Sequence, residues 1–115
     1  TEQDEAILGG VLGLLIRLRS NAREAKNFEV ADKIRDSLAA KEILLEDRAE
    51  VTEWEVKGDP EEAIADLMAL LIELRNRARC EKDFSTADDI RDSLAKAHIT
   101  LEDRTDGTGW SIANT

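Results

Sequence analysis

The stretch that decides the fold reads LLIRLRSNAREAKNFEVADKIRDSLAAKEILLEDR at residues 14–48, and it recurs as LLIELRNRARCEKDFSTADDIRDSLAKAHITLEDR at residues 70–104. The two copies align without a gap, and each residue of the second lies 56 positions after its counterpart, as Phe84 does after Phe28. Internal self-similarity of this kind determines the architecture of a chain. The repeat therefore comes before every other feature of the sequence.

The repeat divides the chain into copy one, residues 1–57, and copy two, residues 58–115. A unit of about 50 residues buries too little apolar surface to be comfortably stable alone. We therefore expect the copies to pack on each other as a pseudo-symmetric pair, or on missing parts of a parent protein. The only methionine is Met68, which favours a piece cut from a longer protein.

Each copy is expected to begin with two helices. Apolar residues recur at spacings of three and four over residues 4–26, which predicts a helix. A second amphipathic segment covers residues 28–41, or residues 84–97 in copy two, and follows an N-cap residue, Asn27 or Asp83. So short a link predicts an antiparallel helical hairpin. The predicted buried stripe of the second helix is Phe28, Ala31, Ile34 and Leu38, with Phe84, Ala87, Ile90 and Leu94 in copy two.

After each helical hairpin the apolar period changes to two, which is typical of strands. The alternating residues are Ile43, Leu45, Thr52, Trp54 and Val56 in copy one, and Ile99, Leu101, Thr108, Trp110 and Ile112 in copy two. Each set predicts a β-hairpin, with Asp106-Gly107 as the turn in copy two. Between the copies, Pro60 fits the first turn of a helix that Asp59 caps. The expected fold class is α+β, with two tandem repeats of a helical hairpin and a small β-hairpin.

The charge balance argues against two classes of partner. The net charge is −10, with nine Lys and Arg against thirteen Asp and Glu in copy one, and seven against thirteen in copy two. Phosphate neutralisation usually dominates nucleic-acid affinity, so both halves argue against non-specific nucleic-acid binding and against docking on an anionic membrane. The longest apolar run, residues 11–16, is too short to span a bilayer.

The chain has one cysteine, Cys80, and one histidine, His98. No intramolecular disulfide can form, so we expect an intracellular, reducing location such as the cytoplasm or an organelle matrix. One Cys and one His also cannot make a zinc site. No P-loop, dinucleotide fingerprint or Ser/His/Asp arrangement is visible. We therefore expect no metal, no cofactor and no catalytic residue.

One ordered string of residues carries a family resemblance. It consists of LLIELR at residues 70–75, then Ala78-Arg79, Lys82-Asp83-Phe84, Ala87-Asp88, Ile90-Arg91-Asp92, Ile99, Leu101-Glu102-Asp103, Gly107-Thr108 and Trp110. This string resembles the C-terminal anticodon-binding segment of cysteinyl-tRNA synthetase, which ends in a helical hairpin and a small β-hairpin. The resemblance covers about 45 residues of each copy. The usual enzyme has one such segment, so two in tandem is a departure.

The resemblance implies a set of base-reading residues in each copy. They are an arginine late in the first helix, an aromatic residue that starts the second, an aspartate one turn later, and the aspartate of the LED strand. By motif position these are Arg23, Phe28, Asp32 and Asp47 in copy one, and Arg79, Phe84, Asp88 and Asp103 in copy two. Unpaired bases stack on aromatic rings. A carboxylate accepts from cytosine or adenine amino groups, and an arginine binds guanine in a fork.

Each of these residues also has a purely structural interpretation. Arg23 with Asp32, and Arg79 with Asp88, could form salt bridges between the two helices. The two phenylalanines could belong to the hairpin core, and the two tryptophans could pack over the helices. Asp47 and Asp103 could stabilise a β-turn.

Departures from the family limit what the resemblance implies. The chain lacks the catalytic nucleotide-binding signatures and zinc ligands of the synthetase, and His98 stands where the family usually has a glycine. The first hypothesis is therefore a non-catalytic module that binds tRNA or a structured RNA loop. The alternative is an acidic protein-interaction domain that kept the fold and lost the RNA. A third possibility is that the chain adds specificity to an enzyme elsewhere in the same polypeptide.

Overall fold

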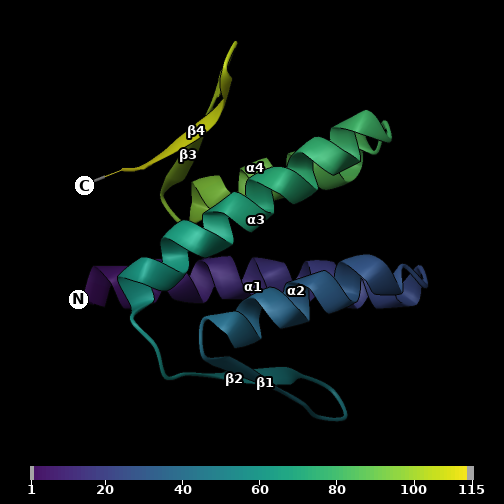
Figure 1. Ribbon diagram of the computed structural model, residues 1–115, viewed down its shortest axis with the longest axis vertical. Coiled ribbons are helices and arrows are strands. Elements are labelled where there is room, and N and C mark those ends of the chain that lie inside the picture. Colours follow the sequence, from purple (N-terminus) through teal and green to yellow (C-terminus); the bar gives the residue numbers. More distant parts are fainter. Residues whose placement is uncertain (1, 114–115) are drawn as a thin grey trace.

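The computed structural model describes residues 2–113 (Figure 1). The elements in chain order are α1 (Glu2–Glu24), α2 (Phe28–Ala40), β1 (Ile43–Asp47), β2 (Thr52–Val56), α3 (Pro60–Cys80), α4 (Phe84–Lys96), β3 (Ile99–Arg104) and β4 (Gly107–Ile112). Within the described residues there are four helices and two antiparallel two-stranded sheets, β1-β2 and β3-β4. The predicted α+β class is confirmed.

At the tip of each helical hairpin, a single residue makes hydrogen bonds to both helices. The Asn27 amide donates to the carbonyl of Ala22 in the last turn of α1, while its side chain accepts from the amide of Val30 in the first turn of α2. Asp83 does the same between α3 and α4. The predicted N-caps are confirmed, and so is Asp59 as the cap of α3, with Pro60 in its first turn.

Each helix–helix or helix–strand corner contains a residue with left-handed backbone that is not glycine. The φ angles are 60° at Lys26, 59° at Glu42, 61° at Lys82 and 68° at His98. Glycine is usual at such positions because it has no Cβ to clash. His98 therefore adopts the backbone conformation that a glycine would favour at the same place.

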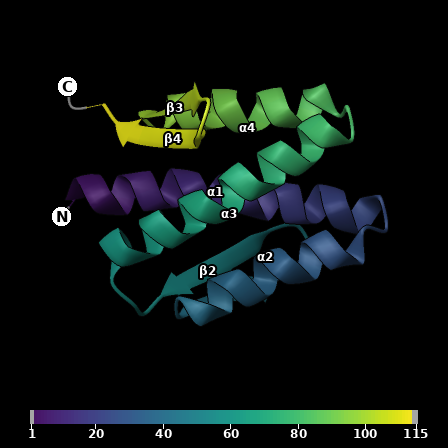
Figure 2. The same ribbon diagram turned by 45° about the horizontal axis from the view of Figure 1, so that its top comes forward.

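Figure 2 shows α1 and α3 crossing in the middle of the molecule, with α2 and its β-hairpin on one side and α4 and its β-hairpin on the other. The crossing buries Val11, Leu12 and Leu15 of α1, and Leu67, Met68 and Leu71 of α3. The second helices add Ile34, Leu38, Ile90 and Leu94. Burial of this continuous aliphatic surface is the main favourable term in folding.

The prediction that Phe28 and Phe84 belong to the hairpin core is wrong. Their side chains are 56% and 57% exposed, whereas the rest of each predicted stripe is buried. Both residues are the first of their helices, at hairpin tips that project beyond the crossing of α1 and α3 (Figure 1). Periodicity places a residue on a helix face, but at the tip no further element covers that face.

The strand register follows the predicted alternation. Ile43 pairs with Val56 and Leu45 with Trp54, as Ile99 does with Ile112 and Leu101 with Trp110. The two tryptophans differ: Trp110 packs against the core as predicted, whereas Trp54 is 43% exposed.

The turn in copy two lies one residue earlier than predicted. Arg104 pairs with Gly107, so Thr105-Asp106 form the turn and Gly107 begins β4 with φ of 139°. A backbone angle of that kind is available mainly to glycine. Among residues 2–113, no helix has the length and apolar content needed to cross a bilayer.

Candidate nucleic-acid interface

A buried arginine holds the carboxylate of the LED strand in each copy. Arg19 of α1 donates from both terminal nitrogens to the two oxygens of Asp47, each at 2.9 Å. Arg75 of α3 binds Asp103 in the same way, again at 2.9 Å twice. Arg19 and Arg75 are only 7% and 6% exposed. A bidentate fork between planar groups fixes the orientation of both partners.

Sequence reasoning missed these two arginines. The available signal was their position: each lies one helical turn before a predicted arginine, Arg23 or Arg79, and is present in both copies. Residues four apart share a helix face. That face could have been expected to carry a pair of arginines.

Two further groups, a threonine hydroxyl and a second arginine, lie beside each carboxylate. The Thr52 hydroxyl, directly across the strand pair, donates to Asp47 at 2.8 Å, and Arg23 approaches the same carboxylate at 3.7 Å. Thr108 and Arg79 lie 3.1 Å and 3.8 Å from the Asp103 carboxylate. The carboxylate thus ties its strand to the first helix and to the opposite strand, rather than only stabilising a turn.

The predicted salt bridges between the helices are wrong. Arg23 and Arg79 approach the strand aspartates instead, and Asp88 pairs at 3.7 Å with Arg91 on its own helix. The strand aspartate is the nearer acceptor because the β-hairpin folds back over the first helix.

One open hollow of about 360 Å³ lies at the tip of copy one, and it is lined by Phe28, Arg23, Ser20 and Glu24.

Asp32 and Asp88 still belong to the same neighbourhood. The pKa of Arg19 is raised, chiefly by its hydrogen bond to Asp47 and, in smaller part, by the charges of Asp47 and Asp32. Asp103 and Asp88 act on Arg75 in the same way. In each copy the late arginine and the two aspartates therefore lie around one arginine fork, and in copy one a shared hollow places the ring of Phe28 beside Arg23.

The forks keep both strand carboxylates ionised. The hydrogen bond from Arg19, followed by that from Thr52, holds the pKa of Asp47 well below its usual range. The hydrogen bond from Arg75 is the largest cause of the same lowering of the pKa of Asp103. Both side chains remain about half exposed. Each site therefore presents a fixed, acceptor-only group to the solvent at neutral pH.

These lowered pKa values predict an acid-sensitive fold. A carboxyl whose pKa is lower in the folded state stabilises the protein above its unfolded pKa, and this contribution is lost as the pH falls towards the folded value. We expect the free energy of unfolding of the wild type to decrease below about pH 4. Asp47→Asn with Asp103→Asn should flatten that decrease. Urea titrations between pH 2 and pH 7 measure it.

The matched control for this experiment replaces Asp36 and Asp92 with asparagine. Both aspartates are exposed on the second helices, and their carboxylates make no hydrogen bond to a buried arginine. This variant should keep the wild-type pH dependence. If the decrease in the free energy of unfolding at low pH flattened equally in both double variants, the two forks would not be the cause of the acid sensitivity.

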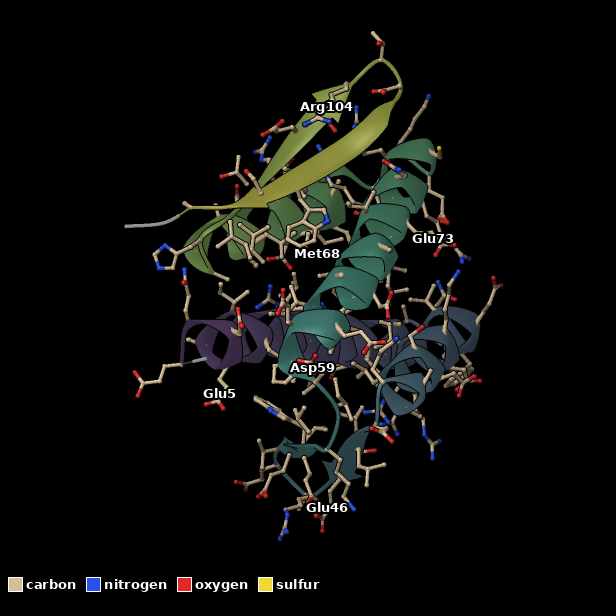
Figure 3. All side chains as sticks on the ribbon, turned by 60° about the vertical axis from the view of Figure 1, so that its left-hand side comes forward. Glu5, Glu46, Asp59, Met68, Glu73 and Arg104 are labelled. Atoms are coloured by element: carbon tan, nitrogen blue, oxygen red, sulfur yellow. The ribbon has the colours of Figure 1, made fainter. Side chains whose placement is uncertain are left out.

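The two sites differ in their surrounding charge. Copy one has Glu24 and Glu53 where copy two has Cys80 and Gly109. Glu53 binds Arg48 at 3.1 Å. In copy two the guanidinium of Arg104 packs against Gly109 instead, 3.1 Å from where a Cβ would lie. Glu81, which aligns with Ala25, offsets the loss of Glu24, so copy two lacks one carboxylate here, opposite its LED strand. Figure 3 shows Arg104 and Glu46 on the two β-hairpins, at opposite ends of the molecule.

No metal site is visible in the part of the chain that the structure describes: residues 2–113 contain no cluster of three or more His, Cys, Asp or Glu arranged to hold an ion. Cys80 is exposed and free.

Comparison with known proteins gives a consistent set of relatives. The chain is 37% identical over 95 residues to a cysteine–tRNA ligase of Chlorobaculum tepidum, which covers 82% of the chain and 19% of the relative. It is 44% identical over 57 residues to the ligase of Micrococcus luteus, and 49% identical over 61 residues to that of a Sulfurihydrogenibium species, each covering about half of the chain and 12% of the relative.

The chain thus spans one fifth or less of the length of these curated relatives. No family model matches the chain, and no solved structure matches it significantly. The resemblance noted in the sequence is nevertheless confirmed by these matches. The chain is homologous to a segment of the cysteine–tRNA ligases.

Proposed function

We propose that this chain is a non-catalytic module that recognises unpaired RNA bases, such as those of a tRNA anticodon loop. The observation that carries the proposal is the site itself. In both copies an exposed phenylalanine begins the second helix, and a buried arginine of the first helix holds the ionised carboxylate of the LED strand in place. The relatives support the choice of RNA, because their name states that they act on tRNA.

The chemistry of the site fits bases better than phosphates. An exposed ring offers a stacking platform that any base can use. The fork occupies both oxygens of the strand aspartate from one side, and the half-exposed carboxylate keeps acceptor capacity on the other. Arg79 lies 3.8 Å from that carboxylate, too far for a tight fork, so its donors remain available for a base edge.

We further propose that each copy carries one such site and that the copies pack as a pseudo-symmetric pair. The forks support this division, because aligned residues make them with the same spacing of 28 residues and the same distances. Copy two is the better site for a polyanion beside the LED strand, since Gly109 replaces the carboxylate of Glu53 there. Binding at copy two is therefore expected to be tighter.

The acidic surface makes a distinct prediction about salt. Affinity that depends on phosphate contacts falls steeply with salt, with a slope set by the number of contacts. A chain of net charge −10 that reads base edges and stacks rings should show a shallow slope. We expect micromolar or tighter binding to a stem-loop with an unpaired loop, and at least tenfold weaker binding to the fully paired duplex of the same sequence.

Fluorescence anisotropy with labelled RNA measures this binding. Asp47→Asn with Asp103→Asn should weaken it about tenfold or more, because a hydrogen bond to a charged group contributes about 1.5–3 kcal/mol. Asp36→Asn with Asp92→Asn is the charge-matched control and should bind as the wild type does. Circular dichroism melts verify that each variant is folded. No binding at low salt, or equal loss in both variants, would rule the proposal out and favour an acidic protein-interaction domain.

A further inference from the structure

The two copies meet through two equivalent helix contacts. The first helix of each copy packs on the second helix of the other: α1 against α4, and α3 against α2. Both contacts lie beside the crossing of α1 and α3 (Figure 2). Aligned residues therefore occupy corresponding places in the two contacts, and their chemistry can be compared directly.

At the centre of these contacts the charges are reversed. Arg17 of α1 donates to Asp89 of α4 at 2.8 Å. The residues aligned with them are Glu73 of α3 and Lys33 of α2, which form an ion pair at 2.5 Å with the opposite polarity. Figure 3 shows Glu73 on the flank of α3. In the contact of α1 with α4, the first helix thus carries the cation and the second helix the anion. In the contact of α3 with α2, the first helix carries the anion and the second helix the cation.

Further along each contact the copies differ again. A Cβ on Gly10 would lie 2.9 Å from the Cβ of Ala97, the residue after α4, so α1 touches it at a position where neither residue has a polar side chain. The aligned pair in the other contact is Asp66 with Lys41, an ion pair that Glu62 extends.

Near the hairpin tips, Arg77 of α3 binds Glu29 of α2 at 3.2 Å. The aligned residues in the other contact, Asn21 and Ser85, are both neutral. The interface therefore differs between the two contacts at three successive places.

We propose that these differences make the pairing of copies heterotypic: copy one accepts copy two and rejects another copy one. In a pairing of copy one with itself, Arg17 would face Lys33. In a pairing of copy two with itself, Glu73 would face Asp89. This inference rests on the proposed pairing of the two copies, and it is independent of RNA binding.

The apolar part of the interface cannot provide this discrimination. The α1 residues Leu12 and Leu15 align with Met68 and Leu71 of α3, and all four are fully buried. Aliphatic burial is non-directional and would stabilise like and unlike pairings alike. Like-charge contacts, in contrast, suppress wrong partners. The partner that fits the apolar face of one copy is therefore the other copy, within the same chain.

A first experiment on the full chain tests the charge coupling. Arg17→Asp with Lys33→Glu, and separately Glu73→Lys with Asp89→Arg, each place like charges at both central positions. We expect each double variant to lower Tm by about 5 °C or more, and the quadruple variant to recover to near the wild type. Because Glu73→Lys with Asp89→Arg changes the net charge from −10 to −6 and so reduces self-repulsion, its loss cannot be a bulk effect. No recovery in the quadruple variant would overturn the proposal.

The control for bulk charge replaces Arg35 with Asp and Lys57 with Glu. Both residues are exposed and lie outside the two contacts, and the change equals that of Arg17→Asp with Lys33→Glu. We expect this control to lower Tm clearly less than Arg17→Asp with Lys33→Glu does. An equal loss would show that the interface charges carry no specific coupling.

A second experiment tests discrimination itself. Lys33→Asp with Glu73→Lys leaves the net charge unchanged and keeps both central contacts attractive, but it also makes each copy complementary to itself. After refolding at about 1 mM, near the effective concentration of linked domains, light scattering should show a substantial dimer fraction for this variant and monomer for the wild type. The same oligomeric state for the variant and the wild type would contradict heterotypic pairing. The Tm of the variant shows whether its fold is intact.

Discussion

Replacing Leu71 with alanine is expected to lower the free energy of unfolding by about 2–5 kcal/mol, the usual range for a buried leucine. Leu71 is fully buried on α3, within the apolar cluster that it shares with Leu12 and Leu15 of α1. The cavity would open where α1 and α3 cross, so both copies would lose contacts. Domains of this size are stable by about 5–15 kcal/mol, and the loss would be a large fraction of that.

Urea unfolding followed by circular dichroism measures this loss, and Leu44→Ala is the matched control. It removes the same atoms from a side chain that is 49% exposed on β1, so its cost should stay below about 1 kcal/mol. The shared core also predicts one cooperative transition for wild type and variant alike. Equal losses in the two variants, or separate transitions for the two copies, would show that the crossing does not unite the chain.

Replacing Phe84 with alanine is expected to weaken RNA binding about 5- to 150-fold, because stacking contributes about 1–3 kcal/mol per base. The side chain is 57% exposed, so its removal should cost little stability. Phe84→Trp preserves the platform and should retain binding. Phe28→Ala should have a smaller effect, since copy one has the carboxylate of Glu53 where copy two has Gly109. Anisotropy titrations and thermal melts, run together, separate binding from folding.

The outcomes of these titrations distinguish the two interpretations of the tip residues. Loss of binding with an unchanged melt identifies a base-stacking platform. A lowered melt with unchanged binding would contradict the proposed site, and would mean that the ring stabilises the hairpin despite its exposure. An equal loss for Phe28→Ala and Phe84→Ala would refute the ranking of the two copies.

Much of the local structure followed from the sequence alone. Asn27 and Asp83 cap the second helices, Pro60 begins α3, and the strand alternation sets the register from Ile43 to Val56. These features depend on groups a few residues apart along the chain, where the chemistry of a cap or an alternating face is sufficient. The turn in copy two was misplaced by one residue because Gly107 fits either position in such a motif.

The candidate site was predicted only in part. The motif identified the strand aspartates and the tip phenylalanines, but paired Arg23 with Asp32 instead of Asp47. It also missed Arg19, whose partner lies 28 residues away. The error over Phe28 has a similar origin, since exposure at the tip depends on which elements lie over it.

By itself, then, the sequence determined the repeat, the helices and strands, and the family of relatives. Tertiary structure decided which charges meet. Arg17 finds Asp89 across 72 residues, and Lys33 finds Glu73 across 40, only because α1 and α3 cross and bring each first helix against the second helix of the other copy. Coulombic attraction acts over a few ångströms of space and is indifferent to separation along the chain. No local pattern could therefore reveal that the two copies carry opposite charges at the same place in their shared interface.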